Sequence, residues 1–483
     1  MKILHIFSDW KWTGPSEPIL NLCSALIKSG EIVHIACLAP PVKSSRVQEF
    51  NSSTVQQSDR TLPLKAEQAG IKTLLLSPLP KYFPFLAMRQ NIKKLAGYIS
   101  EHNFDIIHCH SSMDHFYAAA ILAGLPSPVR SVDSKGNEPR QRSISNTMDT
   151  SNGVKMPACP ATASPLERPV MSSLGKLLFS PLLLYFLTGH AYRIRRHHLP
   201  TPMLRQASKN IKIIRTNHKG FPLELSHSNK FLLKYATDGY IALSKKLAEI
   251  DCKNFSLAPE TVAAISGAVD VIKVRSSEFG VRSSEVRGRL GLKESDVVIG
   301  VVARVQRHRR FKIIIEAMRL VVKEMPLVKL VIIGRGTHYD ELVTRPVKEL
   351  NLGDNVISAG YRSSDDDYFD IINVFDFGIY LVPGSDGSCR AALELMASGK
   401  PLIVARRGVL PEIVDDNRSG LVIDDTPENL AQAILRLAND KELISGFSQQ
   451  ARLKMTNEFS PELSVKATTD FYHNILRSHR TTD

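Results

Sequence analysis

The sequence has few cysteines, and none of them are arranged as a ligand pair. Its 483 residues contain six cysteines, with no Cys-x-x-Cys spacing. Small disulfide-stabilised domains and cysteine-based zinc modules carry denser and more regularly spaced cysteines. Their absence argues against both classes, and it is what we expect of a protein from a reducing compartment.

Long apolar runs are also missing. The N-terminal stretch 2–7 is too short for a secretory signal peptide, and no small-residue cleavage site follows it, so we expect a buried strand there. The most apolar run, 174–189, contains Lys176 and Pro181 and falls short of the ~20 residues that a spanning helix needs. A basic cluster at 193–196 follows. This combination suits either a segment lying on anionic lipid or a buried helix with a solvated end.

Acidic residues are scarce in the first part of the chain. Residues 1–268 hold 32 Lys and Arg against 18 Asp and Glu, whereas residues 269–483 hold 30 of each. The formal net charge of +14 therefore comes from the first part, mainly from 60–98 and 134–210. A basic excess can serve nucleic acid, an anionic membrane surface or an acidic substrate, and composition alone does not choose among them.

Short apolar strands alternate with helical patterns, which indicates an α/β chain whose parallel sheets are covered on both faces. The pattern occurs twice, with a junction near 264–274, and so predicts two Rossmann-like domains facing across a ligand cleft. We expect an N-terminal domain over 1–268, a C-terminal domain over 269–459, and in 460–483 a helix that crosses back to the N-terminal domain. The expected strands are 2–7, 32–38, 104–110, 211–216, 238–243, 296–304, 327–334, 355–361, 375–382, 401–406 and 420–424. The expected helices include 18–29, 113–123, 244–250, 311–325, 339–350 and 460–478.

Residues 134–210 break this rhythm. The piece 143–165 is rich in Ser, Asn and Pro and predicts a disordered or mobile loop, and the apolar-basic stretch follows it. We interpret 134–210 as an insertion into the first domain, partly disordered, with a candidate membrane contact.

The most informative motif is a small-residue loop that joins a strand to a helix within 384–401. Loop amides at a helix N-terminus can bind a diphosphate. Asp386 lies in the loop, and Glu394 lies two helical turns further on, where a carboxylate can accept hydrogen bonds from sugar hydroxyls. Either acid taken alone would suit a merely solvated position. The candidate amides belong to Gly387, Ser388, Cys389 and Arg390.

This stretch resembles the donor-site signature of retaining glycosyltransferases of family 4, which have the GT-B fold. Their pattern is Glu-x7-Glu followed by Ala-Met-Ala-x-Gly-x-Pro. Here Asp386 stands at the first acid and Glu394 at the second, and 394–401 (ELMASGKP) fits well. The next family landmark, Gly-Gly-Leu-Pro-Glu, corresponds to 407–412 (RGVLPE).

The resemblance extends to the loops before this motif. The family pattern Gly-Arg-x4-Lys-Gly places Arg304 on its Arg, Arg309 on its Lys and Arg310 on its Gly, and arginine retains cationic, bidentate binding of phosphate oxygens. Gly334 falls in the family's Gly-x-Gly turn. Gly360 and Tyr361 resemble the turn that reads the nucleotide base.

The basic loop 304–310, taken alone, would also suit a solvated surface or a nucleic-acid contact. Because no aromatic residues interleave with it to stack on bases, we expect no nucleic-acid partner.

The first domain matches the family more loosely. Gly14 falls in the family's Gly-Gly-x-Glu loop, where Pro15 replaces the second glycine and stiffens the backbone. Residues 105–112 resemble the family's Asp-x-x-His-x-His segment. Residues 215–218 resemble the Thr-x-His beside the reacting sugar, so His218 is the leading candidate here, against the alternative of a structural histidine in a loop.

His108 and His110 could pass for a metal pair on a strand. No third ligand is evident in the sequence, and the family needs no metal, so we expect neither a metal nor another cofactor.

The resemblance implies a hexosyl-type transferase of the EC 2.4 class that moves a sugar from a nucleotide-sugar with retention of anomeric configuration. Pre-placed cations and amides would stabilise the leaving diphosphate, which helps deprotonate the acceptor, so no protein nucleophile is required. Domain closure would expel water. The implied roles are Arg304, Arg309, Gly14 and the loop amides on the diphosphate, Glu394 on the ribose, Asp386 on the sugar hydroxyls, and His218 on the sugar or its developing charge.

We expect the acceptor to belong to the cell envelope, as lipopolysaccharide core or a lipid-linked glycan. The basic-apolar mixture in 81–99 and the insertion favour an anionic membrane surface as a partner. The expected location is the cytoplasm, peripheral on the inner face of the cytoplasmic membrane. The alternatives are a transferase with a soluble acceptor and a catalytically silent GT-B scaffold, which the departures at Pro15, Arg309, Arg310 and Asp386 keep open.

Overall fold

The computed structural model describes residues 1–12, 16–40, 61–79, 85–122, 211–275, 283–362, 365–384 and 387–478. The chain divides into two compact units, residues 1–123 with 200–483, and residues 124–199. The second unit and the whole expected insertion at 134–210 lie outside the described residues, as do Gly14 and Asp386. None of the helices in the described ranges combines the length and the apolar character needed to cross a membrane.

The first sheet has seven parallel strands. They are β1 (Lys2–Phe7), β2 (Ile32–Leu38), β3 (Lys72–Leu76), β4 (Ile106–Cys109), β5 (Lys212–Asn217), β6 (Gly239–Ala242) and β7 (Val262–Ala264). Their order is β3-β2-β1-β4-β5-β6-β7. The direction of winding therefore reverses between β1 and β4, whose carboxyl ends form the switch point at which sheets of this kind bind ligands.

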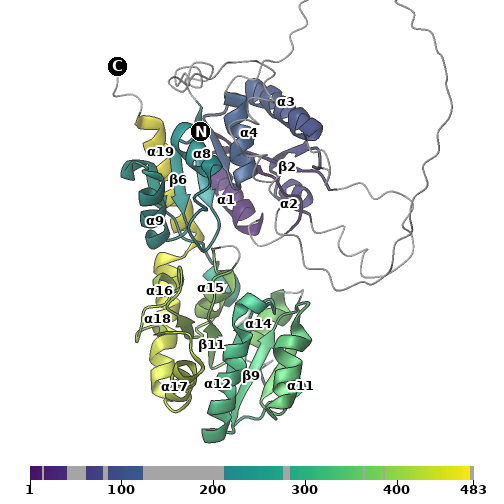
Figure 1. The fold of residues 1–483 in the computed structure, drawn as a ribbon, viewed down its shortest axis with the longest axis vertical. Coiled ribbons are helices and arrows are strands. Elements are labelled where there is room, and N and C mark those ends of the chain that lie inside the picture. The colour runs from purple at the N-terminus through teal and green to yellow at the C-terminus, as the bar shows by residue number, and fades with distance from the viewer. Residues whose placement is uncertain are drawn as a thin grey trace, which may run out of the picture. The chain divides into compact units, whose positions relative to one another are not determined.

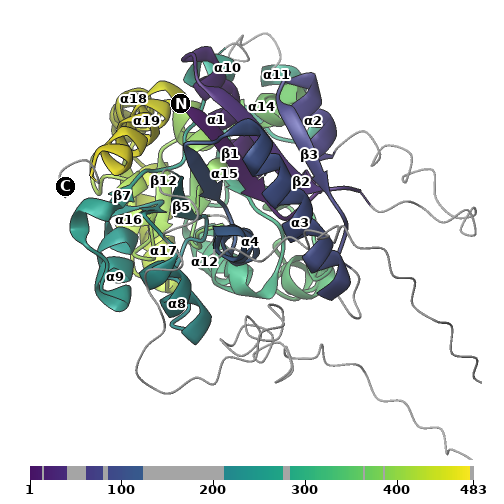
Figure 2. The ribbon, with the colours of Figure 1, turned by 90° about the horizontal axis from the view of Figure 1, so that it is seen from above.

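Helices cover both faces of this sheet, as the nearly continuous burial of β1, β4 and β5 requires. They are α1 (Ser16–Lys28), α2 (Leu62–Gln68), α3 (Phe85–His102), α4 (Ser112–Leu122), α8 (His227–Tyr235), α9 (Lys245–Phe255) and α19 (Pro461–Arg477). The C-terminal α19 packs on α1 (Figure 2) and buries Phe471, Tyr472 and Ile475 in the same core. Gly239 makes this possible, because a Cβ there would lie 3.0 Å from the Phe471 ring.

The second sheet has six parallel strands. They are β8 (Val297–Val302), β9 (Val328–Ile333), β10 (Val356–Gly360), β11 (Phe377–Tyr380), β12 (Leu402–Ala405) and β13 (Gly420–Ile423). Their order is β10-β9-β8-β11-β12-β13, so the switch point lies between β8 and β11.

Two apolar cores flank the second sheet. On one face α12 and α17 lie side by side (Figure 1). On the other, α15 packs with α10 and α18. The helices are α10 (Val271–Arg275), α11 (Ser283–Arg289), α12 (Phe311–Glu324), α13 (Arg345–Glu349), α14 (Asp365–Asn373), α15 (Arg390–Ala397), α16 (Leu410–Ile413), α17 (Pro427–Ala438) and α18 (Lys441–Glu458).

The two-sheet α/β architecture predicted from the strand-helix alternation is confirmed. One expected element differs in detail: the helix predicted at 339–350 is a π turn, Asp340–Thr344, followed by α13. Pro346 explains the change, because proline has no backbone N–H to continue the α-helical ladder. The edge strands β3 and β7 and helices α2, α3, α8, α10 and α11 were not among the expected elements.

Candidate active site

The predicted donor loop leads directly into α15. Gly387, Ser388 and Cys389 are buried, and Cys389 adopts a left-handed backbone with φ 49° just before the helix begins. A Cβ at Gly387 would lie 2.6 Å from the carbonyl oxygen of Lys219, so only glycine fits. The first N–H groups of a helix have no partner within it, which makes this turn an anion-binding geometry.

Glu394 lies on the buried face of α15 and is 7% exposed. Its Oε2 accepts a hydrogen bond from the Tyr368 hydroxyl at 2.7 Å, and its Oε1 accepts one from Arg390 Nε at 2.6 Å. Arg390 also forms an ion pair with Glu17 of α1. Burial raises the pKa of Glu394, and the Arg390 cation and the Tyr368 hydroxyl oppose that rise. A ligand hydroxyl that reaches this carboxylate must share or replace these donors.

The turns after β8, β9 and β10 pack backbone against backbone. A Cβ at Gly334 would lie 2.0 Å from the carbonyl oxygen of Ala303, and one at Gly336 would lie 1.9 Å from that of Val305. The Gly334 N–H donates to the carbonyl oxygen of Gly360 at 2.9 Å. The predicted Gly-x-Gly turn thus joins two other loops at the carboxyl edge of the sheet.

Tyr361 stands exposed beside this junction, with 51% of its surface accessible. The guanidinium of Arg335 lies 4.2 Å from the centre of the Tyr361 ring, a cation–π contact. Gly360, immediately before it, has φ 71°, which glycine adopts without strain. The turn therefore presents a flat, stacked surface.

The basic loop after β8 spans the switch point of the second sheet. Arg309 Nη1 donates to the carbonyl oxygens of Val382 and Pro383 at 3.1 and 3.2 Å, at the end of β11. Its buried Nε–H has no partner among the described residues. Arg304 is exposed. Arg310 adopts φ 62°, the left-handed conformation suited to the glycine that the family has there.

Two motifs of the first domain lie on neighbouring strands and bond to each other. His108 Nε2 lies 2.6 Å from Thr216 Oγ1, and His110 Nδ1 lies 2.8 Å from His218 Nε2. Residues two apart share one face of a strand, so the His-x-His that ends β4 pairs with the Thr-x-His that ends β5, and His110 and His218 lie just past the two strands. His108 Nδ1 is also hydrogen-bonded to the Tyr472 hydroxyl of α19, at 2.6 Å.

A third histidine joins this group from β1. His5 is paired with His108 in the parallel register of β1 and β4, and its Nδ1 lies 2.8 Å from His110 Nε2. Burial, reinforced by His218, lowers the pKa of His5 to about 3. Burial, reinforced by Arg215, lowers that of His218 to about 4. These imidazoles are therefore neutral at pH 7.

Two buried carboxylates fix the loops around these histidines. Asp114 accepts hydrogen bonds from the N–H of Ser8 at 2.6 Å and of His110 at 3.1 Å, which ties together the loops after β1 and β4. Asp251 accepts a hydrogen bond from the Tyr240 hydroxyl at 2.6 Å and supports the loop that follows β5. Burial raises the pKa of both carboxyls, against the hydrogen bonds that they accept.

The donor loop contacts the predicted histidine. The Gly387 N–H donates to the carbonyl oxygen of His218. Two further glycines permit this approach, since a Cβ at Gly220 would lie 2.9 Å from Pro383 and a Cβ at Gly267 would lie 2.9 Å from Ser388. Residues from the carboxyl edges of both sheets thus meet at one place.

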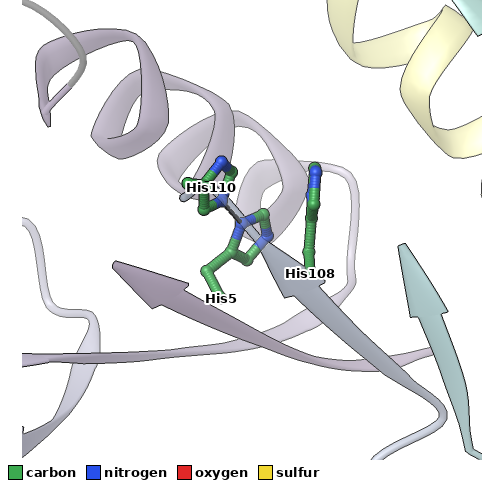
Figure 3. A group of neighbouring side chains, drawn as sticks. All are labelled: His5, His108 and His110. Carbon is green, nitrogen blue, oxygen red and sulfur yellow. Dashed lines mark hydrogen bonds between the residues drawn. The ribbon is translucent and has the colours of Figure 1, made fainter. Parts of the chain in front are cut away.

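His5, His108 and His110 are the group within the described ranges whose ring nitrogens come close enough together, within 4.8 Å of one another, to consider a metal ion (Figure 3). The sequence suggested no third ligand for the His108–His110 pair, and His5 supplies one. However, both nitrogens of His108 are already hydrogen-bonded, and His5 and His110 are hydrogen-bonded to each other. Zinc at about 2.0–2.1 Å from each nitrogen would require breaking these bonds. The arrangement fits a hydrogen-bonded network better than a metal centre.

The structure thus brings together most of the predicted site residues. His218 lies against the loop of Gly387, Arg309 spans the switch point beside that loop, and Glu394 lies in the helix that follows it. His5 was missed, because its place beside the His-x-His strand depends on the order β3-β2-β1-β4, which puts β1 next to β4. Tyr368 and its bond to Glu394 had no sequence signal.

Two Rossmann-like parallel sheets of this kind define the GT-B fold, and solved structures agree. A glycosyltransferase from Rickettsia africae superposes with a TM-score of 0.64 at 15% identity, over 99% of each chain. The Anabaena protein HepE, solved in complex with UDP, superposes with a TM-score of 0.62 at 14% identity, over 97% of this chain and 99% of its own.

Matches to protein-family models identify the family as well as the fold. Residues 283–454 match the model for glycosyl transferases group 1, and residues 14–132 match that for glycosyltransferase family 4. Together the two matches cover more than half of the chain, and the protein belongs to glycosyltransferase family 4.

The individual relatives share limited identity with this chain, over only part of its length. The N-acetyl-alpha-D-glucosaminyl L-malate synthase of Bacillus anthracis is 25% identical over 199 residues, which is 41% of this chain and 50% of the relative. The chain spans about half the length of the first curated relatives it matches.

Proposed function

We propose that the protein transfers a hexosyl-type sugar from a nucleotide-sugar to an acceptor with retention of anomeric configuration. The observation that carries this proposal is the contact between the Gly387 amide and the carbonyl of His218. It supports a site in which a diphosphate at the N-terminus of α15 would leave its sugar beside the histidine of β5.

The donor would be bound mainly by the second domain. Tyr361 and the adjoining turn would receive the base, and Glu394 would hold the ribose. The unpartnered, buried Nε–H of Arg309 supports a place for an anionic oxygen nearby, and exposed Arg304 would approach the same diphosphate. These donors would stabilise the charge that grows on the leaving group. Asp386 and Gly14 retain their proposed contacts with the sugar and the diphosphate.

The reaction proposed here needs no metal or other cofactor. The two domains would meet between 268 and 269. Ile265 packs in the first core and Val269 in the second, which supports this boundary, with 460–483 returning to the first domain. Closure of the domains would exclude water from the donor.

We propose an envelope acceptor, as in lipopolysaccharide core or a lipid-linked glycan, and a peripheral position on the inner face of the cytoplasmic membrane. Helix α3 supports this: Leu86 is 74% exposed, and Arg89, Lys93 and Lys94 are exposed along the same helix. Each basic residue near an anionic surface contributes about 1 kcal/mol. The second candidate is a soluble acceptor, which is supported by the relative that is named for L-malate.

The donor proposal is tested by measuring hydrolysis or transfer from a panel of nucleotide-sugars. Arg304→Ala and Glu394→Ala should each abolish turnover while the protein stays folded, as a cooperative thermal transition shows. The exposed Lys323→Ala of α12 is the matched control and should turn over normally. Full activity of both site variants would exclude this donor site. If no nucleotide raises the melting temperature, the chain is a silent scaffold.

The membrane proposal is tested by sedimentation with vesicles of phosphatidylcholine and phosphatidylglycerol. Arg89→Glu with Lys93→Glu should weaken association, as should deletion of 134–210. Lys323→Glu with Lys348→Glu, an equal charge reversal on exposed positions of the second domain, is the control. If the α3 double variant and the deletion variant both bind the vesicles as well as the wild type does, the soluble acceptor is favoured.

A further inference from the structure

Three imidazoles form one continuous hydrogen-bonded chain across the switch point of the first sheet. His218 Nε2 lies 2.8 Å from His110 Nδ1, and His110 Nε2 lies 2.8 Å from His5 Nδ1. The chain starts in the core, since His5 is 0% exposed and His110 is 5% exposed. It ends at His218, which is only partly buried and lies against the donor loop. Figure 3 shows its inner link, with His108 outside it.

The inner end fixes the direction of the chain. His5 Nε2 is buried and has no hydrogen-bond partner among the described residues. A neutral imidazole carries one N–H and one lone pair, so all three rings must point the same way. If His218 donated inward, His5 would be left with a buried N–H that has no acceptor, an arrangement that proteins rarely tolerate. If His5 donates outward from Nδ1, only a lone pair remains unpaired.

We propose that His5 and His110 are positioning residues that hold His218 as the neutral tautomer with its proton on Nδ1. His5 Nδ1–H donates to His110 Nε2, and His110 Nδ1–H donates to His218 Nε2. His218 then offers a fixed N–H to an oxygen of the bound sugar or phosphate. This inference rests on the proposed function and chooses between the two roles given to His218. The imidazole orients the donor by donating a hydrogen bond; it neither supports a developing positive charge nor removes a proton.

The surroundings favour the neutral state of all three rings. Burial is the main cause that lowers the pKa of each. The guanidinium of Arg215 on β5 adds to the lowering for His110 and His218. His108 does not compete for a place in the chain, because both of its nitrogens are engaged by Thr216 and Tyr472.

The direct test is long-range proton–nitrogen correlation NMR on the full chain labelled with ¹⁵N-histidine, which reads the tautomer of each ring at pH 7. Single histidine substitutions assign the signals. The wild type should show His218 with a protonated Nδ1 and an unprotonated Nε2. His5→Leu should leave His218 as a mixture of tautomers. In His5→Asn a side-chain N–H can still donate to His110, so the wild-type tautomer should return.

The matched control is His34→Leu. His34 is also a buried strand histidine, on β2 next to β1, but it bonds to Tyr98 and not to the chain. It should leave the His218 signals unchanged. A His218 that carries its proton on Nε2 in the wild type, or one that keeps its tautomer in His5→Leu, overturns the inference.

Turnover of the best nucleotide-sugar gives the second readout. Loss of a neutral hydrogen bond corresponds to a roughly 2- to 12-fold effect. Because His5→Leu leaves a mixture of His218 tautomers, kcat should fall by at least about 2-fold and by no more than about 12-fold, with a nearly constant KM and partial recovery in His5→Asn. A tautomer that depends on His5 while turnover stays at the wild-type level supports the chain and overturns the role proposed for His218. The two failures are thus distinguishable.

Discussion

Replacing Glu394 by glutamine should weaken nucleotide binding while the protein stays folded. Glutamine keeps the volume of the side chain and one acceptor oxygen, but it removes the negative charge. A ribose hydroxyl that donates to a carboxylate makes a charge-assisted hydrogen bond, which contributes about 1.5–3 kcal/mol. At 1.36 kcal/mol per tenfold, the dissociation constant of the nucleotide should rise roughly 10- to 150-fold.

The effect on stability should be modest. In the free protein Glu394 binds the hydroxyl of Tyr368 and the guanidinium of Arg390. Glutamine can still accept from the tyrosine, and Arg390, whose side chain is 43% exposed, keeps Glu17. The free energy of unfolding should therefore fall by no more than about 1–2 kcal/mol.

Isothermal titration calorimetry with UDP measures the dissociation constant of the nucleotide, and thermal unfolding measures the loss of stability. If another nucleoside diphosphate raises the melting temperature of the wild type more than UDP does, that nucleotide is used in the titration instead. Glu316→Gln removes a carboxylate from a partly exposed ion pair with Arg319 on α12 and serves as the control. A Glu394→Gln variant that binds the nucleotide within twofold of the wild type refutes the placement of the ribose on Glu394.

Three further outcomes follow from the structure. Arg390→Met should raise the pKa of the buried Glu394 further, because it removes the cation that opposes the rise. Binding needs the ionised carboxylate, so affinity should be lost as the pH is lowered from 8 to 5. In Arg390→Met this loss should begin at a higher pH than in the wild type; an unshifted profile would contradict this. Gly387→Ala should abolish turnover, since its Cβ would lie 2.6 Å from a backbone oxygen, whereas Gly353→Ala, with nothing within 4 Å, should turn over normally. Tyr472→Phe should lower the free energy of unfolding by about 1–3 kcal/mol, because a buried imidazole nitrogen on β4 loses its partner; denaturant titration that finds no loss would argue against that bond.

The sequence predicted the α/β class and nearly all the central strands. Strands such as β8 and β12 are apolar on both faces and flanked by helical patterns, so the local sequence is enough to predict that they are buried. Edge strand β3 escaped prediction because an exposed edge does not need a continuous apolar run. The glycine turn that leads into α15 was also readable, since Gly387, Cys389 and Glu394 are close in sequence and belong to a single turn and helix.

Contacts between distant segments could not be read in this way. Arg390 looked like a loop amide at a helix start, yet its side chain joins Glu17 and Glu394, which lie 373 and 4 residues away. Arg309 was expected on a phosphate, and its guanidinium also holds the carbonyls at the end of β11. Such side-chain partners depend on which loops the strand order brings together at the carboxyl ends of the sheets.

By itself the sequence determined the family, the two-sheet architecture and the glycine turn that leads into α15, because these are local patterns of burial and backbone conformation. The tertiary structure alone decided that His5, His110 and His218 form one chain. Three residues more than a hundred positions apart become neighbours only when β1, β4 and β5 align in one parallel sheet, and the hydrogen bonds that result depend on register and burial.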